Sequence, residues 1–303
     1  MPQRQDNSGG AWTIGRVVQW SAQDFARRGL DSPHLDAELL LAHVLGTDRL
    51  RLILDRDRPL SDGELTAYRG LIQRRRDGEP VAYILGHREF YGLPFCVDRR
   101  VLIPRPDTET LVGVALERTR ARDLFGRALD LCTGSGCVAI AFARQRPTWD
   151  VVGVDVDPAA VAVARDNALR LGTAATTRFV AGDLFAPLSD ATPFDLVMAN
   201  PPYIPTGEYE QLEREIRGFE PRLALDGGRD GLDVVRRIVD EAQGLLAPGG
   251  VLALEVHCDQ ADAVATLLTG SGLQAVQRDR DFGGHERVVS GHTRRPDAGQ
   301  GPP

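Results

Sequence analysis

The sequence predicts an α/β protein in which a mostly parallel β-sheet follows a small helical bundle and a β-hairpin linker. Three observations support this fold class. Up to residue 80 the chain carries helical periodicity and helix caps, from 81 to 105 it changes to short strand-like runs separated by glycines, and from residue 127 strands alternate with helices. Alternation of strands and helices is typical of a parallel sheet that helices cover.

Length and composition fit one large or two medium globular domains. Hydrophobic residues make up 42% of the 303 residues and charged residues 26%, and no run of 18 apolar residues or signal-type start is present. We therefore expect a cytoplasmic protein with no membrane contact. A net charge of −7 argues against direct nucleic-acid binding. The four cysteines show no CxxC pair and no zinc-type His spacing, so neither disulfides nor a metal site are expected.

The first part of the chain predicts a helical docking domain. Residues 1–12 read as a disordered leader, and residues 13–80 carry the helices. Ser32 followed by Pro33 marks one helix start, and Ser61 with Glu64 forms a capping box at another. Glycines mark the ends of these helices. The expected helices begin near residues 13, 33 and 62, and the second and third end near residues 46 and 78.

Residues 81–106 read as a hairpin linker that leads into the second domain. Short strands are expected at 83–86, 89–92 and 95–97, with glycine turns between them. Two prolines between Ile103 and Asp107 then stiffen the chain before a helix that begins near Thr108. No catalytic group can be assigned from the helical domain itself, so it is expected to dock a partner.

Residues 107–290 are expected to form the catalytic domain, and residues 291–303 a disordered tail. Apolar runs and helical periodicity set the order of its elements. Strands are expected at 128–131, 151–154, 177–180, 195–199, 251–256, 274–279 and 286–290, and helices at 137–145, 158–170, 232–246 and 260–268.

One apolar run, from Phe194 to Ala199, ends abruptly in Asn200, Pro201, Pro202 and Tyr203. Proline fixes φ near about −65° and keeps the residue before it extended, so Asn200 is held rigidly and both prolines offer only carbonyl oxygens. An Asn side-chain oxygen beside a backbone carbonyl makes a pair of acceptors suited to an NH2 group. The same residues also fit a strand-ending turn with a capping Asn.

Small and acidic residues end the first three strands of the predicted sheet. After the first strand, a loop of small residues runs into a helix, where free N–H groups and a close backbone approach suit a ligand. Asp155 lies at the end of the second strand and is suited to ribose hydroxyls, whereas Asp157 is better explained as a helix cap. Asp183 follows the third strand and suits an adenine amino group, with Leu184 or Phe185 beside the ring, although a turn at the strand end explains the same residues. Without a phosphate-binding Lys or Arg, this pattern favours a positively charged nucleoside such as S-adenosylmethionine. The loop residues are Cys132, Thr133, Gly134, Ser135 and Gly136.

Taken in this order, the motifs resemble those of class I methyltransferases that modify nitrogen. Four longer stretches resemble the HemK-type (PrmC) release-factor glutamine methyltransferases more specifically, and the resemblance covers about residues 13–290. Within the family's loop, glycine often stands where this chain has Cys132, and some relatives carry a larger aromatic residue at the position of Leu184. The stretches are Tyr83–Gly92, Ile103–Glu109, Glu220–Leu232 and Asp281–Arg287.

The resemblance implies methyl transfer from S-adenosylmethionine to the side-chain amide nitrogen of the glutamine in the Gly-Gly-Gln loop of peptide-chain release factors, leaving S-adenosylhomocysteine. Asn200 and Pro201 are then the expected catalytic residues, with Pro202, Tyr203 and Phe90 around the substrate. Asn200 is also expected to touch the cofactor, together with the glycine loop, Asp155, Asp183 and Leu184. We expect a monomer whose protein partners are release factors.

Three other functions remain open from the sequence. A paralogue that modifies a glutamine in a ribosomal protein would share every catalytic residue. Enzymes that methylate the adenine amino group of DNA or RNA also use Asn-Pro-Pro-Tyr, although this chain has no basic surface and no separate target-recognition domain. A catalytically silent cofactor-binding adaptor is the third, and the intact segment from Asn200 to Tyr203 argues against it.

Overall fold

The computed structural model describes residues 11–122, 124–188 and 192–295, which form two compact units. One unit ends at Gly86 and also contains Arg214–Phe219. The other begins at His87, runs to Glu213 and resumes at Glu220. The chain therefore passes between the units three times. None of the helices in these described ranges is both long enough and apolar enough to span a bilayer.

The helical unit is built around a core that the amphipathic helices share. Phe25, Leu40 and Tyr68 are fully buried in it, and the Tyr68 hydroxyl donates to the Ala37 carbonyl at 3.0 Å. The capping box predicted at Ser61 is present. The helices are α1 (Ile14–Arg27), α2 (Pro33–Leu45), α3 (Arg49–Leu54), α4 (Asp62–Arg76) and α5 (Val81–Leu85).

Residues 83–85 form part of helix α5, so the strand expected at 83–86 is wrong. The amide groups of Tyr83 and Ile84 both donate to the Pro80 carbonyl at 3.0 Å, and Gly86 ends the helix with a φ of 77°. Ile84 is buried in the helical core. A short apolar run fits a buried helix as well as a strand, and here packing against the helical core decides between them.

Helix α9 (Arg214–Phe219) was not predicted and belongs to the helical unit, although it lies far along the chain. Arg75 of α4, which is 3% exposed, holds it. The Arg75 guanidinium donates to Asp36 Oδ2 at 2.7 Å and also to the Glu215 carboxylate of α9. This ion triad joins a segment from beyond residue 213 to helices α2 and α4.

The expected hairpin is confirmed as β1 (His87–Phe90) and β2 (Leu93–Cys96), which pair antiparallel. Tyr91 and Gly92 link them with φ values of 52° and 71°, the signs that a two-residue type I′ turn requires. The Asn167 side chain of α8 (Pro158–Arg170) accepts from the Cys96 amide at 2.8 Å and donates to its carbonyl at 3.0 Å. The hairpin is therefore fixed to helix α8 of the second unit.

The second unit contains a sheet in the order β5-β4-β3-β6-β7-β9-β8. Strands β3 to β7 are parallel, and β8 and β9 run antiparallel at one edge. This confirms the predicted fold class. The strands are β3 (Arg127–Leu131), β4 (Asp150–Asp155), β5 (Thr177–Ala181), β6 (Phe194–Ala199), β7 (Leu246–Glu255), β8 (Gln274–Arg280) and β9 (Glu286–His292).

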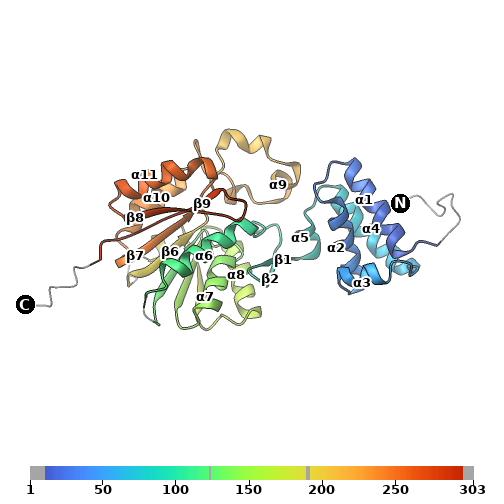
Figure 1. Ribbon diagram of the computed structural model, residues 1–303, viewed down its shortest axis with the longest axis horizontal. Coiled ribbons are helices and arrows are strands. Elements are labelled where there is room, and N and C mark those ends of the chain that lie inside the picture. The colour runs from blue at the N-terminus through green and yellow to red at the C-terminus, as the bar shows by residue number, and fades with distance from the viewer. Residues whose placement is uncertain (1–10, 123, 189–191, 296–303) are drawn as a thin grey trace, which may run out of the picture. The chain divides into compact units, whose positions relative to one another are not determined.

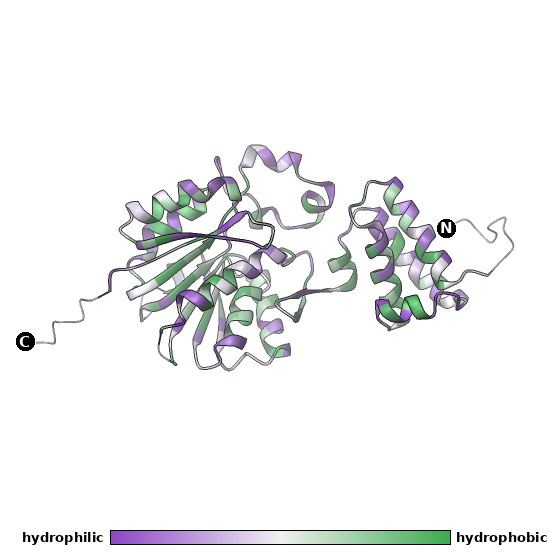
Figure 2. Ribbon diagram, in the orientation of Figure 1, coloured by the Kyte–Doolittle hydropathy of each residue, from purple (hydrophilic) through white to green (hydrophobic). Residues whose placement is uncertain are grey.

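Helices cover both faces of this sheet (Figure 1). Helices α6 (Glu109–Arg118), α7 (Cys137–Gln145) and α8 pack on one apolar core, and α10 (Asp233–Ala242) and α11 (Ala261–Gly270) pack on the other. A strand that is buried on both faces has a nearly continuous run of apolar residues. Figure 2 shows the central strands mostly in green, the colour of hydrophobic residues. β9 extends to His292, so the sheet includes two residues of the expected tail. Residues 1–10 and 296–303, which hold most of the expected leader and tail, lie outside the described ranges.

The order of the strands reverses between β3 and β6, which is where an open α/β sheet forms a crevice at its carboxyl edge. Leu131 of β3 pairs with Val154 of β4 on one side and with Ala199 of β6 on the other. The loops that follow these three strands therefore begin side by side.

Replacing the buried Arg75 should unfold the helical unit more easily. Arg75→Leu is expected to lower the free energy of unfolding by about 3–5 kcal/mol, because it leaves buried carboxylates without their partner. Arg74→Leu is the matched control, since the partly exposed pair of Arg74 with Glu79 should contribute about 1 kcal/mol or less. Urea titration followed by circular dichroism measures both, and equal losses would show that the triad does not stabilise the unit.

Candidate active site

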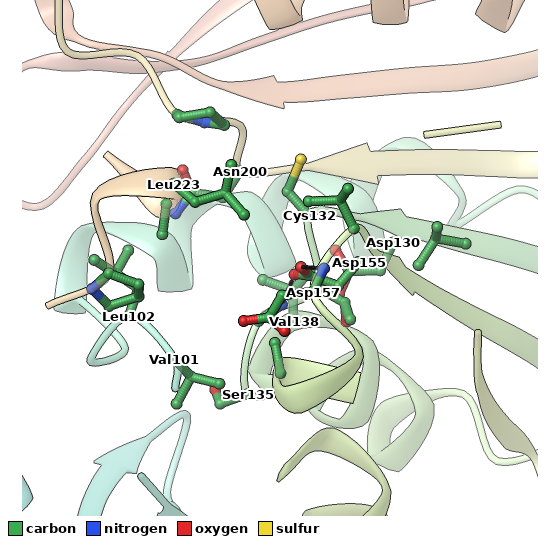
Figure 3. A pocket seen from close by; sticks show the side chains of 18 of the residues that line it. Val101, Leu102, Asp130, Cys132, Ser135, Val138, Asp155, Asp157, Asn200 and Leu223 are labelled. Atoms are coloured by element: carbon green, nitrogen blue, oxygen red, sulfur yellow. Dashed lines mark hydrogen bonds between the residues drawn. The ribbon is translucent and has the colours of Figure 1, made fainter. Parts of the chain in front are cut away.

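A cavity of about 350 Å³ lies where strands β3, β4, β5 and β6 end, and Figure 3 shows side chains that line it. The strand ends that the sequence singled out thus meet in one place. The predicted site residues that line the cavity are Cys132, Thr133, Gly134, Ser135, Asp155, Asp183, Leu184, Asn200 and Pro202.

The glycine loop takes backbone angles that favour glycine. Cys132 has a φ of 56°, Gly134 of 54° and Gly136 of 78°. Cys132 therefore occupies a position where a side chain costs free energy. A Cβ on Gly136 would lie 3.1 Å from the side chains of Ala164 and Ile140. Gly136 thus packs the start of α7 against the core and does not line the cavity.

Asp130, near the end of β3, braces the glycine loop from below. Its Oδ2 accepts from Thr133 Oγ1 at 2.6 Å and from the Ala139 amide at 3.2 Å. Asp130 is 1% exposed, and this burial raises its pKa to about 7 against the opposing effect of the two hydrogen bonds. Asp130 was not among the predicted site residues.

Asp155 connects the glycine loop to the second strand. Its Oδ2 accepts from the Gly134 amide at 2.8 Å and its Oδ1 from the Asp157 amide at 3.0 Å. Burial raises the pKa of Asp155, and these backbone bonds oppose the shift. Since each carboxylate oxygen has two lone pairs, the side chain keeps acceptor capacity toward the cavity. Asp157 accepts from the Ala159 amide at 2.8 Å, which confirms the predicted helix cap.

Asp183 and Leu184 differ in exposure at the end of β5. The Asp183 side chain is 55% exposed and forms an ion pair with Arg237 of α10 at 2.8 Å. Leu184 is buried and has a φ of 47°. Arg237 also lines the cavity and was not predicted from the sequence. A side chain from a helix some 50 residues further along the chain is not visible in a local motif.

The Asn200 side chain is fixed by a contact beneath the turn. Its Nδ2 donates to Thr108 Oγ1 at 3.2 Å, so Oδ1, the other branch of the planar amide, points away from Thr108. Pro201 and Pro202 are buried, and Pro202 lines the cavity. The extended backbone that the prolines impose therefore carries a side chain with a defined orientation.

Glycines from the next loop support this turn. A Cβ on Gly227 would lie 2.6 Å from the Pro202 carbonyl oxygen, which no side chain tolerates. The Tyr203 carbonyl accepts from Gln260 Nε2 at 2.9 Å, and burial raises the pKa of the Tyr203 phenol, which therefore stays protonated at neutral pH. The Glu220–Leu232 motif thus packs against the Asn-Pro-Pro-Tyr turn.

Besides Gly136, the structure places three predicted residues outside the cavity lining. Pro201 and Tyr203 belong to the turn but do not line the cavity. Phe90 is 1% exposed and packs edge-on against Phe95, with their ring centroids 6.0 Å apart. Phe90 is thus part of the hydrophobic core, and the described contacts do not bring it to the other site residues.

Two polar residues near Asn200 were not among the predicted site residues. Thr108 is 2% exposed, and Glu255 at the end of β7 is 1% exposed. The sequence carried a signal for each, since Thr108 lies in the Ile103–Glu109 motif and Glu255 ends an apolar strand with an acidic residue. Neither signal says what the side chain contacts.

Comparisons with known proteins agree with this architecture. Residues 16–86 match the model of the PrmC N-terminal domain, and residues 108–217 match that of the methyltransferase small domain. In three dimensions the chain is similar to the hMettl16 catalytic domain, solved in complex with an RNA hairpin of the MAT2A 3'UTR. That match has a TM-score of 0.56 at 16% identity and covers 80% of this chain and 85% of the other, so it shows the fold alone.

Two curated relatives are similar over almost the full length. The release factor glutamine methyltransferase of Geobacter sulfurreducens is 45% identical over 280 residues, which are 92% of this chain and 96% of the relative. The enzyme of the same name from Vibrio cholerae is 42% identical over 279 residues, with the same two coverages. Together with the fold and the turn at Asn200, this identifies a class I methyltransferase. The chain belongs to the release factor glutamine methyltransferase family.

The buried Asp130 should make stability depend on pH. Its folded pKa of about 7 lies above its unfolded value, so its contribution to stability is present below about pH 4 and is lost as the pH rises through 7. Asp130→Asn should therefore flatten the decline in the free energy of unfolding between these values by a few kcal/mol, on the order of 1.4 kcal/mol per unit of pKa shift. Denaturant titrations at several pH values measure this slope.

Asp230→Asn is the control for this experiment, because the exposed Asp230 pairs with Arg236 and has a pKa of about 2. Its substitution should leave the slope between pH 4 and 7 as in the parent protein. If Asp130→Asn left the slope unchanged as well, Asp130 would not be the group that titrates.

Proposed function

We propose that this enzyme methylates the side-chain amide nitrogen of the glutamine in the Gly-Gly-Gln loop of peptide-chain release factors, with S-adenosylmethionine as the methyl donor. The observation that carries the proposal is the oriented Asn200 amide in a cavity that also contains the glycine loop. Its relatives, 37–45% identical, are release factor glutamine methyltransferases. We place the enzyme in the cytoplasm as a monomer, without direct contact to nucleic acid or membrane.

The residues of the cavity fit a nucleoside that carries an amino-acid tail. Ser135 Oγ lines the cavity, is buried and has no hydrogen-bond partner among the described residues. A Cβ on Gly134 would meet nothing within 4 Å, so the loop backbone is open to a ligand there. We assign the ribose to Asp155, the adenine to Asp183 and Leu184, and the tail to the glycine loop. When bound, S-adenosylmethionine supplies a methyl group on a positively charged sulfur.

The residues of the turn perform the positioning that this chemistry needs. A carboxamide nitrogen is a weak nucleophile because its lone pair is delocalised into the carbonyl. We assign Asn200 Oδ1 and the Pro201 carbonyl as acceptors for the two amide hydrogens of the substrate glutamine. Both acceptors draw electron density toward the nitrogen and hold it in one orientation. Alignment of two bound reactants accounts for roughly 7–11 kcal/mol of a reaction barrier.

The substrate follows from one experiment. The enzyme is incubated with methyl-labelled S-adenosylmethionine and, in separate arms, a purified release factor, a ribosomal protein fraction and DNA, and mass spectrometry locates the label. The proposal expects label on the glutamine of the Gly-Gly-Gln loop. Label on a ribosomal protein alone would instead make the enzyme a ribosomal-protein paralogue, and label on DNA would make it an adenine methyltransferase.

Removal of the Asn200 amide should stop turnover without releasing the cofactor. Asn200→Ala is expected to lower kcat by about 10²–10³, the usual effect of losing one preorganised hydrogen-bond partner. The dissociation constant of S-adenosylmethionine, measured by calorimetry, should change much less. A variant that methylates at close to the parent rate would rule out the proposed amide contact.

Removal of the Asp155 carboxylate should instead weaken binding of the cofactor. Asp155→Ala is expected to weaken S-adenosylmethionine binding by about 10–100-fold, since hydrogen bonds to a charged group contribute about 1.5–3 kcal/mol. Asp157→Ala serves as the control, because loss of this helix cap should lower stability by about 1 kcal/mol and affinity less. Unchanged affinity of the Asp155 variant in calorimetry would remove Asp155 from the ribose site.

A further inference from the structure

We propose that Thr108 and Glu255 are positioning residues that hold the Asn200 amide in the orientation that accepts a substrate NH2 group. The inference rests on the proposed role of Asn200. It concerns how a side chain with two nearly identical branches is kept from turning over. A reversed amide would present its own NH2 to the NH2 of the substrate, and two donors do not pair.

Strand register places Glu255 beside Asn200. β6 and β7 are parallel neighbours, and Ala199 pairs with Leu254. Asn200 and Glu255 are the next residues of these strands, so the two side chains start from adjacent positions at the carboxyl edge of the sheet. Glu255 is buried and does not line the cavity, which suits a role beneath the turn and not contact with substrate.

The Thr108 hydroxyl links the two side chains. Its oxygen accepts from Asn200 Nδ2 at 3.2 Å. A hydroxyl has one hydrogen and two lone pairs, so the hydrogen of Thr108 is available for a second partner. We assign the Glu255 carboxylate as this partner, because strand register starts Glu255 beside Asn200 and because a hydrogen bond from Thr108 lowers the pKa of Glu255. The two hydrogen bonds therefore point in one direction, because Asn200 donates to Thr108 and Thr108 donates to Glu255.

The surroundings of Glu255 explain why the last acceptor is a carboxylate. Its Oε2 has no hydrogen-bond partner among the described residues. Burial raises its pKa to about 7, the Thr108 hydrogen bond lowers it, and the nearby charges are Arg287, Asp107 and Arg105. Tyr203 and Cys137, the other titratable neighbours, stay protonated because burial raises the pKa of each. An ionised carboxylate only accepts hydrogen bonds, so it leaves Thr108 a single direction in which to donate.

Protonation of Glu255 would reverse the direction of these hydrogen bonds. Protonated Glu255 can donate to the Thr108 oxygen, and the hydrogen of Thr108 is then free for another acceptor. Thr108 can then donate to Asn200 Oδ1, which stabilises the reversed amide. Glu255 therefore has to be ionised for the productive orientation, and turnover at saturating substrates should fall as the pH is lowered through 7.

The test compares paired substitutions in the full-length enzyme with a release factor and S-adenosylmethionine. Thr108→Val and Glu255→Met remove the hydroxyl and the final acceptor, and each should lower kcat about 10-fold, because a buried donor loses its partner. Thr108→Ser keeps the hydroxyl that the hydrogen bonds need and should retain most of the turnover. Glu255→Gln places an NH2 donor where protonated Glu255 has its OH, so its kcat should be low at every pH. Thr110→Val makes the same chemical change two residues away and should stay within about twofold of the parent enzyme.

Two readouts separate positioning from a general structural effect. The double variant Thr108→Val with Glu255→Met should be no slower than either single variant, because both act on one orientation. The fall of kcat below pH 7 should disappear in Glu255→Gln. Any one of three results would overturn the inference. The effects of the two substitutions on kcat could multiply in the double variant, the pH profile of Glu255→Gln could match that of the parent, or kcat of Thr108→Val could lie within twofold of the parent.

One measurement does not depend on the substrate. The side-chain amide of Asn200 gives an NMR signal that is assigned by its loss in Asn200→Ala. Its hydrogens should exchange slowly in the parent and in Thr108→Ser, and at least 10-fold faster in Thr108→Val. Equal exchange in all three proteins would overturn the inference, whereas a parent enzyme that does not methylate release factors would overturn the proposed function alone.

Discussion

Parallel pairing of β3 with β6 is the constraint on which the rest of the site depends. Because Leu131 pairs with Ala199, the loops after these strands start at the same edge of the sheet and diverge from there. One loop is rich in glycine and open to a ligand, and the other is locked by prolines. The glycine loop forms a binding side and the proline-containing turn a reacting side, one strand apart within a single cavity.

Much of the polarity of the site lies beneath the cavity. Asp130 supports the glycine loop, Glu255 lies next to Asn200, and Arg287 donates to Asp281 at 3.1 Å and pairs with Asp107 at 3.3 Å. Buried polar groups lower stability unless they are paired, so a protein keeps them where orientation matters more than stability. The glycine loop and Asn200 are thus held in place by neighbouring polar residues.

Local signals in the sequence predicted what local chemistry determines. The Ser61 capping box, the Asp157 cap, the hairpin turn and the strand ends at Asp155 and Asn200 follow from neighbours within a few residues. Helix α5, helix α9 and the burial of Phe90 depend on which distant surface each apolar residue meets, so no local pattern distinguishes them from a strand, a loop or a pocket wall. The Asp183–Arg237 pair and the Thr108–Asn200 contact join residues far apart in sequence and needed the fold.

Helix α9 has a consequence for how such proteins can evolve. The helical unit takes one of its helices from residues 214–219, and Glu215 of that helix meets a guanidinium that is otherwise shut away from water. A gene segment that stops at residue 86 therefore encodes an incomplete unit. An exchange of the segment up to residue 86 alone would leave Arg75 without the Glu215 carboxylate, so the two segments of the unit have to change together.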